Sequence, residues 1–170
     1  MIKILIFLLL VACSSHEKPL PTAQSVDVQR YVGKWYAIAA FPQFFTRECK
    51  SQTAEYAVID KQTISVVNTC IKKKGQSSIK GEAVVINTDT NAELEVKFDK
   101  FFLKLFNVKG DYTIIKLDPQ YRYVLVGSKD RDSLWILSRS KMMPAEEYEA
   151  YVSFAQDSDF DTSELKKSEL

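Results

Sequence analysis

The sequence predicts an all-β protein, an eight-stranded antiparallel up-and-down barrel followed by a C-terminal α-helix. Segments rich in Val, Ile, Tyr and Phe follow one another with short turns between them, which is typical of hairpin-linked strands. No long connection of the Greek-key type interrupts the series, so a β-sandwich is disfavoured. Antiparallel strands linked in this way can close on themselves, which removes exposed edges and leaves room for one small ligand.

Turn residues separate the expected strands. Asp60-Lys61, residues 87–91 and Asp118-Pro119 combine Asp, Asn or Pro with neighbouring polar residues, which favours tight turns. The expected strands lie near residues 35–41, 50–59, 63–72, 78–87, 92–98, 111–117, 121–127 and 133–139.

A helix is expected after the last strand. Pro144 can occupy its first position, where a missing N–H costs nothing, and Glu146 and Glu147 place negative charge in the first turn. An apolar stripe with helical spacing follows, and we expect it to pack on the outside of the barrel. The stripe consists of Tyr148, Tyr151, Val152 and Ala155.

The first twelve residues have the pattern of an export signal. Lys3 supplies a positive start, and the apolar residues 4–12 are far fewer than the roughly 20 that span a bilayer as a helix. Leu10-Val11-Ala12-Cys13 resembles the bacterial lipoprotein cleavage box. The resemblance implies cleavage before Cys13.

Lipid attachment at Cys13 follows from that resemblance. It implies a diacylglyceryl thioether on the Cys13 sulfur and an acyl chain such as palmitate on the new amino group. Several chains, at about 0.8 kcal/mol per buried methylene, anchor a protein stably, whereas one does not. Ser14 in place of Asp implies sorting to the outer membrane, where the periplasmic face is expected. The expected division is a signal peptide at 1–12, a lipidated tether at 13–27 and the barrel domain at 28–170.

The charge balance argues against a nucleic-acid partner. The full chain has 23 basic and 22 acidic residues, so loss of Lys3 with the signal leaves 22 of each. A net charge of zero is not the basic surface that nucleic-acid binding requires.

Cys49 and Cys70 remain as an even pair once Cys13 carries lipid, and an oxidising compartment favours a disulfide between them. The two cysteines lie at the far ends of one expected hairpin, and the bridge needs a bulge or an offset. Closing this loop can contribute about 3 kcal/mol. A cysteine nucleophile lacks a partner, because the only histidine, His16, lies in the tether.

No signature of an enzyme accompanies these features. The sequence has no Gly-x-Ser-x-Gly elbow, no phosphate-binding glycine loop and no spaced histidines for a metal. Asp and Glu are scattered over turns, without a paired acid and base. We therefore predict no catalytic residues, no metal site and no cofactor.

Three sequence blocks in this order resemble the lipocalins, and within them the bacterial outer-membrane lipoprotein lipocalins related to apolipoprotein D. The blocks are Gly33–Tyr36 with Pro42, residues 117–126, and residues 134–139. The resemblance extends over residues 28–160, and it implies the same barrel fold. In lipocalins the Trp of the first block packs against the Arg of the third at the closed end. Gly33, Trp35 and Arg139 are thus expected to have a structural role.

The lumen-facing residues follow partly from alternation and partly from the resemblance. On the first and last strands, a period of two anchored on Trp35 and Arg139 points Ala37, Ala39, Phe41, Trp135 and Leu137 inward. On the middle strands the resemblance implies four pocket positions. With Trp135, the expected ligand-binding residues are Tyr56, Asn68, Phe98, Tyr112 and Trp135. Alternatively, such large residues simply fill the barrel.

Apolar clusters are expected in two links at the open end of the barrel. Clusters of this kind mark a membrane or ligand contact, or else they fold down and cap the core. The two clusters are Phe44-Phe45 and Phe101-Phe102 with Leu103, Leu105 and Phe106.

The leading functional hypothesis is a lipid-anchored lipocalin that binds or carries a fatty acid or lysophospholipid in the bacterial envelope. The alternative is a structural or partner-docking lipoprotein whose barrel is filled by its own side chains; a cavity volume separates the two. The sequence leaves open whether the protein forms a homodimer. A dimer contact through an aromatic C-terminal tail is not expected, because residues 161–170 are polar and charged.

Overall fold

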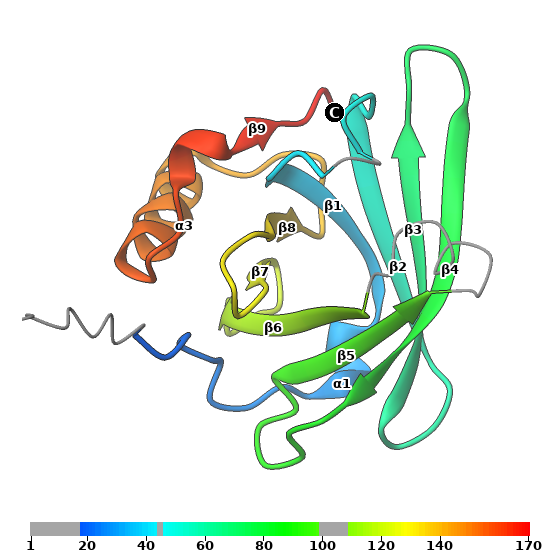
Figure 1. The fold of residues 1–170 in the computed structure, drawn as a ribbon, viewed down its shortest axis with the longest axis vertical. Helices are drawn as coiled ribbons and strands as arrows, with labels where there is room; N and C mark the ends of the chain where they lie inside the picture. Colours follow the sequence, from blue (N-terminus) through cyan, green and yellow to red (C-terminus); the bar gives the residue numbers. More distant parts are fainter. Residues whose placement is uncertain (1–17, 44–45, 99–108) are drawn as a thin grey trace, which may run out of the picture.

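The computed structural model describes residues 18–43, 46–98 and 109–170, which form one barrel with a helix beside it (Figure 1). The elements are α1 (Val28–Tyr31), β1 (Gly33–Ala40), β2 (Ser51–Val58), β3 (Thr63–Ile71), β4 (Gln76–Val85), β5 (Glu93–Phe98), β6 (Lys109–Leu117), β7 (Tyr123–Gly127), β8 (Leu134–Ser138), α3 (Ala145–Asp157), the 3₁₀ turn η1 (Thr162–Glu164) and β9 (Lys166–Lys167). Within these ranges no helix is long and apolar enough to cross a bilayer.

Each strand from β1 to β8 pairs antiparallel with the next, and β8 pairs back with β1. The sheet is therefore a closed up-and-down barrel, which confirms the predicted fold. We call the end with the links after β1, β3, β5 and β7 the loop end, and the opposite end the base. The expected strands match the observed ones to within a few residues, because alternation and turn residues mark both ends of each hairpin.

Two apolar cores lie on opposite faces of the barrel wall. The first lies in the lumen around Trp35 and Val66, and the second lies between the wall and α3. Tyr148, Tyr151 and Ala155 are the buried residues of α3, and the helix lies outside the barrel beside β8 (Figure 1). The expected outer position of this helix is confirmed.

A bulge in β1 reverses the alternation halfway along the strand. Ala37 pairs with Leu137, but Ala39 pairs with Ile136, so one extra residue is inserted at Ile38. Ala37 lies in the lumen, whereas Ala39 and Phe41 belong to the core under α3. The prediction that Ala39 and Phe41 point into the lumen is therefore wrong, because a single inserted residue turns every later side chain to the other face.

The C-terminal tail completes the wall where β1 and β2 separate. Pairing of β1 with β2 ends at Tyr36, and β9 pairs with Ala39 and Ala40 beyond that point. Glu169 N–H donates to Lys50 O at 2.7 Å, so the tail bridges the two strands. This strand was not expected, because two consecutive lysines have none of the apolar alternation that marks a strand.

Residues 18–27, which we call the strap, lie against the barrel. Ala23 N–H donates to Ile114 O at 2.8 Å, and Val26 N–H donates to Thr90 O at 2.7 Å. Val26 is only 2% exposed and belongs to the lumen core. The chain thus packs on the barrel before residue 28, within the stretch that the sequence assigns to a tether. Leu20, Ala23 and Val26 make the apolar contacts, and they are too few and too isolated to form a recognisable pattern.

The predicted disulfide between Cys49 and Cys70 is confirmed, with a Cα–Cα distance of 5.3 Å. Cys70 pairs across the hairpin with Gln52, so the bridge has the expected offset. It fastens the β1–β2 link to the end of β3 at the loop end.

Candidate ligand-binding cavity

The lumen contains a cavity of about 570 Å³, which is within the range of roughly 300–1,000 Å³ that is usual for small-molecule sites. Inward residues of the barrel strands form its wall. Its lining continues into the links of the loop end through Gln43, Thr46, Lys72, Ser128, Asp130 and Ser133.

All five residues expected to contact a ligand lie in the cavity wall: Tyr56 on β2, Asn68 on β3, Phe98 on β5, Tyr112 on β6 and Trp135 on β8. They come from five strands, and the closed sheet turns their side chains toward one space. A ligand in this space would be close to all of them.

The cavity changes from apolar to polar along the barrel axis. In its inner part the wall is aliphatic, with Ile64, Val66 and Leu94 buried in the lumen core. Toward the loop end the lining gains hydroxyl, amide and charged groups. Lys72 is the cation among the described lining residues, and its Nζ lies 2.9 Å from Glu48 Oε2.

Three tyrosine hydroxyls meet in the lumen core. Tyr112 Oη lies 2.6 Å from Tyr31 Oη and 3.0 Å from Tyr56 Oη. Burial raises the pKa of Tyr56 to about 12 and raises the pKa values of Tyr31 and Tyr112 well above their ordinary value. The three phenols are therefore neutral at physiological pH, and the two hydrogen bonds among them use two of their three O–H donors.

Tyr31 is the member of this cluster that sequence reasoning missed. It belongs to α1, a single turn before the first strand, which places its ring in the lumen core against Trp35 at 5.4 Å between ring centroids. The available signal was Asp27, which caps the turn by accepting hydrogen bonds from the Gln29 and Arg30 amides. A capped helical turn directly before the first strand indicates a segment that can fold under the barrel and close its base.

Asn68 is polar but unpaired. Its Oδ1 is buried and has no hydrogen-bond partner among the described residues, although buried polar atoms are normally satisfied. Because Asn68 lines the cavity, this atom can accept a hydrogen bond from a ligand or from water there.

Trp35 and Arg139 close the base. The guanidinium carbon of Arg139 lies 3.8 Å from the centre of the Trp35 ring, and Trp35 Nε1 donates to Tyr31 O at 2.9 Å. Gly33 has φ +97°, and a Cβ there would lie 3.3 Å from Arg139 Nη1, so glycine leaves room for the guanidinium. Partial burial lowers the pKa of Arg139 from its ordinary value.

Four of the five N–H donors of the Arg139 guanidinium are bonded to backbone carbonyls. Charge-assisted hydrogen bonds of this kind are stronger than neutral ones, and the planar fork of Arg suits several acceptors at once. The acceptors are the carbonyl oxygens of Lys34 (3.1 Å), Arg30 (2.7 Å), Tyr31 (2.9 Å) and Tyr121 (3.3 Å).

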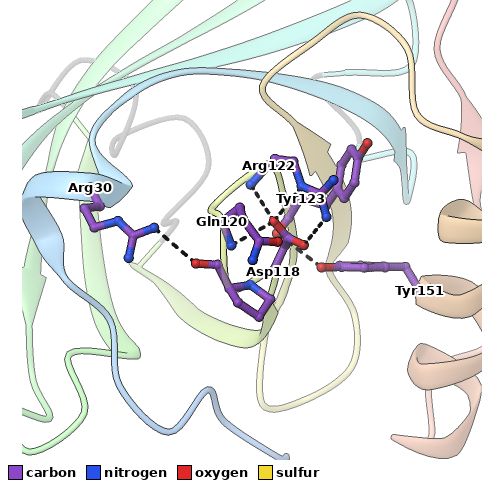
Figure 2. Close-up of polar contacts among 7 residues, drawn as sticks. Arg30, Asp118, Gln120, Arg122, Tyr123 and Tyr151 are labelled. Atoms are coloured by element: carbon purple, nitrogen blue, oxygen red, sulfur yellow. Dashed lines mark hydrogen bonds and ion pairs between the residues drawn. The ribbon is translucent and has the colours of Figure 1, made fainter.

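The β6–β7 turn extends this closed end toward both helices (Figure 2). Asp118 accepts from Arg122 Nη2 at 2.8 Å and from the Gln120 and Arg122 amides, and these hydrogen bonds lower the pKa of its carboxyl. Arg30 of α1 donates to Pro119 O at 3.1 Å. In Figure 2 Tyr151 of α3 approaches the same turn from the other side, and its hydroxyl donates to Tyr123 O at 3.2 Å.

The expected apolar clusters of the links, Phe44-Phe45 and residues 101–106, lie outside the described residues. In the part of the chain that the structure describes, no three His, Cys, Asp or Glu side chains gather as metal ligands.

Comparison with known proteins gives matches along most of the chain. The model of the Lipocalin-like domain family matches residues 26–169. Outer membrane lipoprotein Blc of Escherichia coli (strain K12) is 35% identical over 161 residues, covering 92% of this chain and 88% of that protein. Temperature-induced lipocalin-1 of Arabidopsis thaliana is 34% identical over 157 residues, covering 91% and 84%.

Less similar proteins match the chain as well. Apolipoprotein D of Mus musculus is 31% identical over 134 residues, covering 74% of this chain and 67% of that protein. The solved structure of insecticyanin from the tobacco hornworm Manduca sexta has a TM-score of 0.66 at 17% identity, covering 90% and 85%, which shows a shared fold. The resemblance read from the three sequence blocks is confirmed, and the chain belongs to the lipocalin family.

Proposed function

We propose that this lipocalin binds or carries a single-chain lipid, a fatty acid or a lysophospholipid, in the bacterial envelope. The observation that carries the proposal is the cavity of about 570 Å³ with an aliphatic inner part. Each methylene moved from water into such a space stabilises the complex by about 0.8 kcal/mol. The role is one of binding, and no step of covalent chemistry is proposed.

The cavity favours entry of the ligand with its acyl chain first. Among the described residues, no cation lines the inner part, because Arg139 stacks on Trp35 outside the cavity lining and uses four of its five N–H donors on backbone carbonyls. The tyrosine hydroxyls there are neutral and paired with one another. A charged head group would lose its hydration without gaining partners, so it stays at the loop end, where Lys72 lines the cavity.

Among the expected contact residues, we propose a distinct role for each chemical type. Phe98 and Trp135 contact the chain through their rings, and the Tyr56–Tyr112 pair closes the inner part of the site. Asn68 supports a polar atom of the ligand through its unpaired amide oxygen.

The alternative of a barrel filled by its own side chains does not fit the structure. A filled interior leaves voids scarcely larger than one water molecule, whereas this lumen contains about 570 Å³ of open space.

We also propose that Cys13 carries the lipid anchor after cleavage of residues 1–12 and that the protein lies on the periplasmic face of the outer membrane. The support is the Leu10–Cys13 box and the likeness to the outer membrane lipoprotein Blc. Mass spectrometry of the mature N-terminus tests the anchor, and membrane fractionation tests the location. An unmodified Cys13 would contradict the proposal.

Binding is tested with a soluble form that begins at Lys18 and so keeps the strap. Delipidated protein is titrated with long-chain fatty acids and lysophospholipids while displacement of a fluorescent lipid is followed. We expect saturable binding to one site. Absence of binding by folded protein would contradict the proposal for these lipids.

A matched pair of variants on β4 separates cavity binding from surface adsorption. Ala83 is 2% exposed and lines the cavity, whereas its neighbour Val84 is partly exposed and does not. Ala83→Phe places a ring in the lumen and is expected to weaken binding at least tenfold. Val84→Phe adds the same ring elsewhere and is expected to leave binding unchanged. Equal effects would indicate adsorption outside the barrel.

A further inference from the structure

The strap enters the fold at the loop end of the barrel. Lys18 lies beside the β7–β8 link, where Arg131 Nη2 donates to Lys18 O at 2.6 Å and Lys18 Nζ donates to Asp157 O at 3.0 Å. The same link contacts the β1–β2 link, because Gln43 Nε2 donates to Asp132 O at 3.0 Å. Lys18 is therefore fastened at the end where the cavity lining reaches the links.

From Lys18 the strap runs toward the base. Ala23 contacts Ile114 in the middle of β6, and Val26 contacts Thr90 in the β4–β5 turn at the base. Asp27 N–H then donates to Tyr121 Oη at 2.9 Å. The direction of the strap is thus set by hydrogen bonds at its start, middle and end.

The position of Lys18 limits where an anchor at Cys13 can lie. Residues 13–17 span at most about 18 Å when fully extended. The nine residues of β3 span about 30 Å at the usual rise per residue. A lipid on Cys13 therefore leaves the protein near the loop end, because even the fully extended connection is shorter than the wall.

From this geometry we propose that the anchor holds the loop end, with the cavity, against an anionic bilayer surface. The inference rests on the proposed lipid attachment at Cys13 and adds the orientation that the strap imposes. A ligand then passes between bilayer and cavity without crossing water as a free monomer.

The β3–β4 turn is a second contact at the same end. Lys73 and Lys74 are exposed in this turn, and neither forms an ion pair with any of the described residues. Ile71 beside them is 41% exposed. Two free cations next to an exposed aliphatic side chain suit the interface of a bilayer with anionic head groups.

Exposed charges at the base and at the loop end of the barrel differ in how well they suit an anionic bilayer surface. At the base, Asp60 and Lys61 are exposed in the β2–β3 turn and Asp89 in the β4–β5 turn, so these turns carry no net positive charge toward an anionic surface. At the loop end, Asp130 and Asp132 lie in the β7–β8 link, so this link is not the attractive part. The contact is made by the anchor on one side of the cavity and by the β3–β4 turn on the other.

The test uses the full lipidated protein in vesicles of phosphatidylethanolamine and phosphatidylglycerol with an energy acceptor on the head groups. Gln76→Cys at the loop end and Thr88→Cys at the base each carry the same donor dye; both residues are exposed. Energy transfer is expected to be at least twofold higher from position 76. Equal transfer, or higher transfer from position 88, would overturn the orientation.

Three further variants assign the cause. Thirty Gly/Ser residues inserted between Glu17 and Lys18 are expected to reduce the difference between the dyes, and an unchanged difference would overturn the role of the strap. Lys73→Gln with Lys74→Gln is expected to lower transfer from position 76 when phosphatidylglycerol is present, whereas Lys61→Gln at the base is not. Equal effects of these lysine changes would overturn the contact by the β3–β4 turn.

Vesicle flotation separates failure of the orientation from failure of the anchor. Protein that floats with vesicles but transfers energy equally from both positions contradicts the orientation alone. Protein that does not float lacks the anchor, which contradicts both the orientation and the proposed attachment at Cys13.

Discussion

Arg139 holds three segments of the chain together at the base. Its guanidinium donates hydrogen bonds to carbonyl oxygens at the start of β1, at the end of α1 and in the β6–β7 turn. Lysine keeps the charge but lacks the fork that reaches several carbonyls. We expect Arg139→Lys to lower the free energy of unfolding by about 2–4 kcal/mol, measured by chemical denaturation of the soluble form.

Arg122→Lys is the matched control for this change. Arg122 pairs with the buried Asp118, but its own side chain is 52% exposed. Lysine at this exposed position keeps a cation beside the Asp118 carboxylate, so we expect a loss of only about 1 kcal/mol. If both variants lost the same stability, the special role of the Arg139 carbonyl contacts would be contradicted.

The buried tyrosines couple stability to alkaline pH. The pKa of Tyr56 is raised to about 12 in the folded state, above the value of about 10 expected in the unfolded chain. The unfolded state therefore releases this proton first, so stability is intact below pH of about 10 and falls as pH rises toward 12. Tyr56→Phe removes the ionisable group, and we expect a shallower fall of the unfolding free energy between pH 9 and 11.

Spectrophotometric titration at 295 nm gives an independent measure. The difference between the wild type and Tyr56→Phe is expected to titrate with a midpoint near 12. A difference that titrates near 10 would show that the Tyr56 hydroxyl is in contact with water.

The β2–β3 hairpin is cross-linked to the link before it by Cys49 and Cys70, which are 21 residues apart. A loop of this length stabilises the protein by about 3 kcal/mol, mainly through the unfolded chain. We expect the Cys49→Ser, Cys70→Ser variant to lose about that much unfolding free energy. A reductant should destabilise the wild type and leave the double variant unchanged; a wild type insensitive to full reduction would contradict the estimate.

The strap is expected to contribute to stability as well as to orientation. Leu20 and Ala23 pack on the two cores, and the Ala23 amide is bonded to Ile114. A form that begins at Ser25 loses these contacts, and we expect it to be about 1–3 kcal/mol less stable than the form that begins at Lys18. Equal stability in thermal and denaturant unfolding would indicate that the strap is docked too weakly to direct an anchor.

The barrel as a whole should respond to an occupant, because ligand that binds only the folded state stabilises it. At a free concentration of 100 times the dissociation constant, the gain is about 2.7 kcal/mol. We expect a bound single-chain lipid to raise the melting temperature of the soluble wild type but not that of Ala83→Phe. A rise of the same size in both would place the lipid outside the lumen.

Much of this molecule follows from local pattern. The strands, their order, the outer helix and the disulfide were all predicted from alternation, turn residues and cysteine count. The five expected contact residues do lie in the cavity wall, although on the middle strands the choice of face came from family resemblance, because alternation alone is symmetric between the two faces.

What only the tertiary structure decided depends on long-range register. The bulge at Ile38 turned Ala39 and Phe41 away from the lumen, and no local signal marks it. Tyr31 joins the lumen cluster only because α1 folds under the barrel. The strap packs on the barrel through hydrogen bonds to Ile114 and Thr90, and β9 forms because β1 has no β2 partner beyond Tyr36. Such contacts pair residues far apart in the chain, so they stabilise the protein only after the barrel has closed. A strand, in contrast, is recognisable from the alternation within its own few residues.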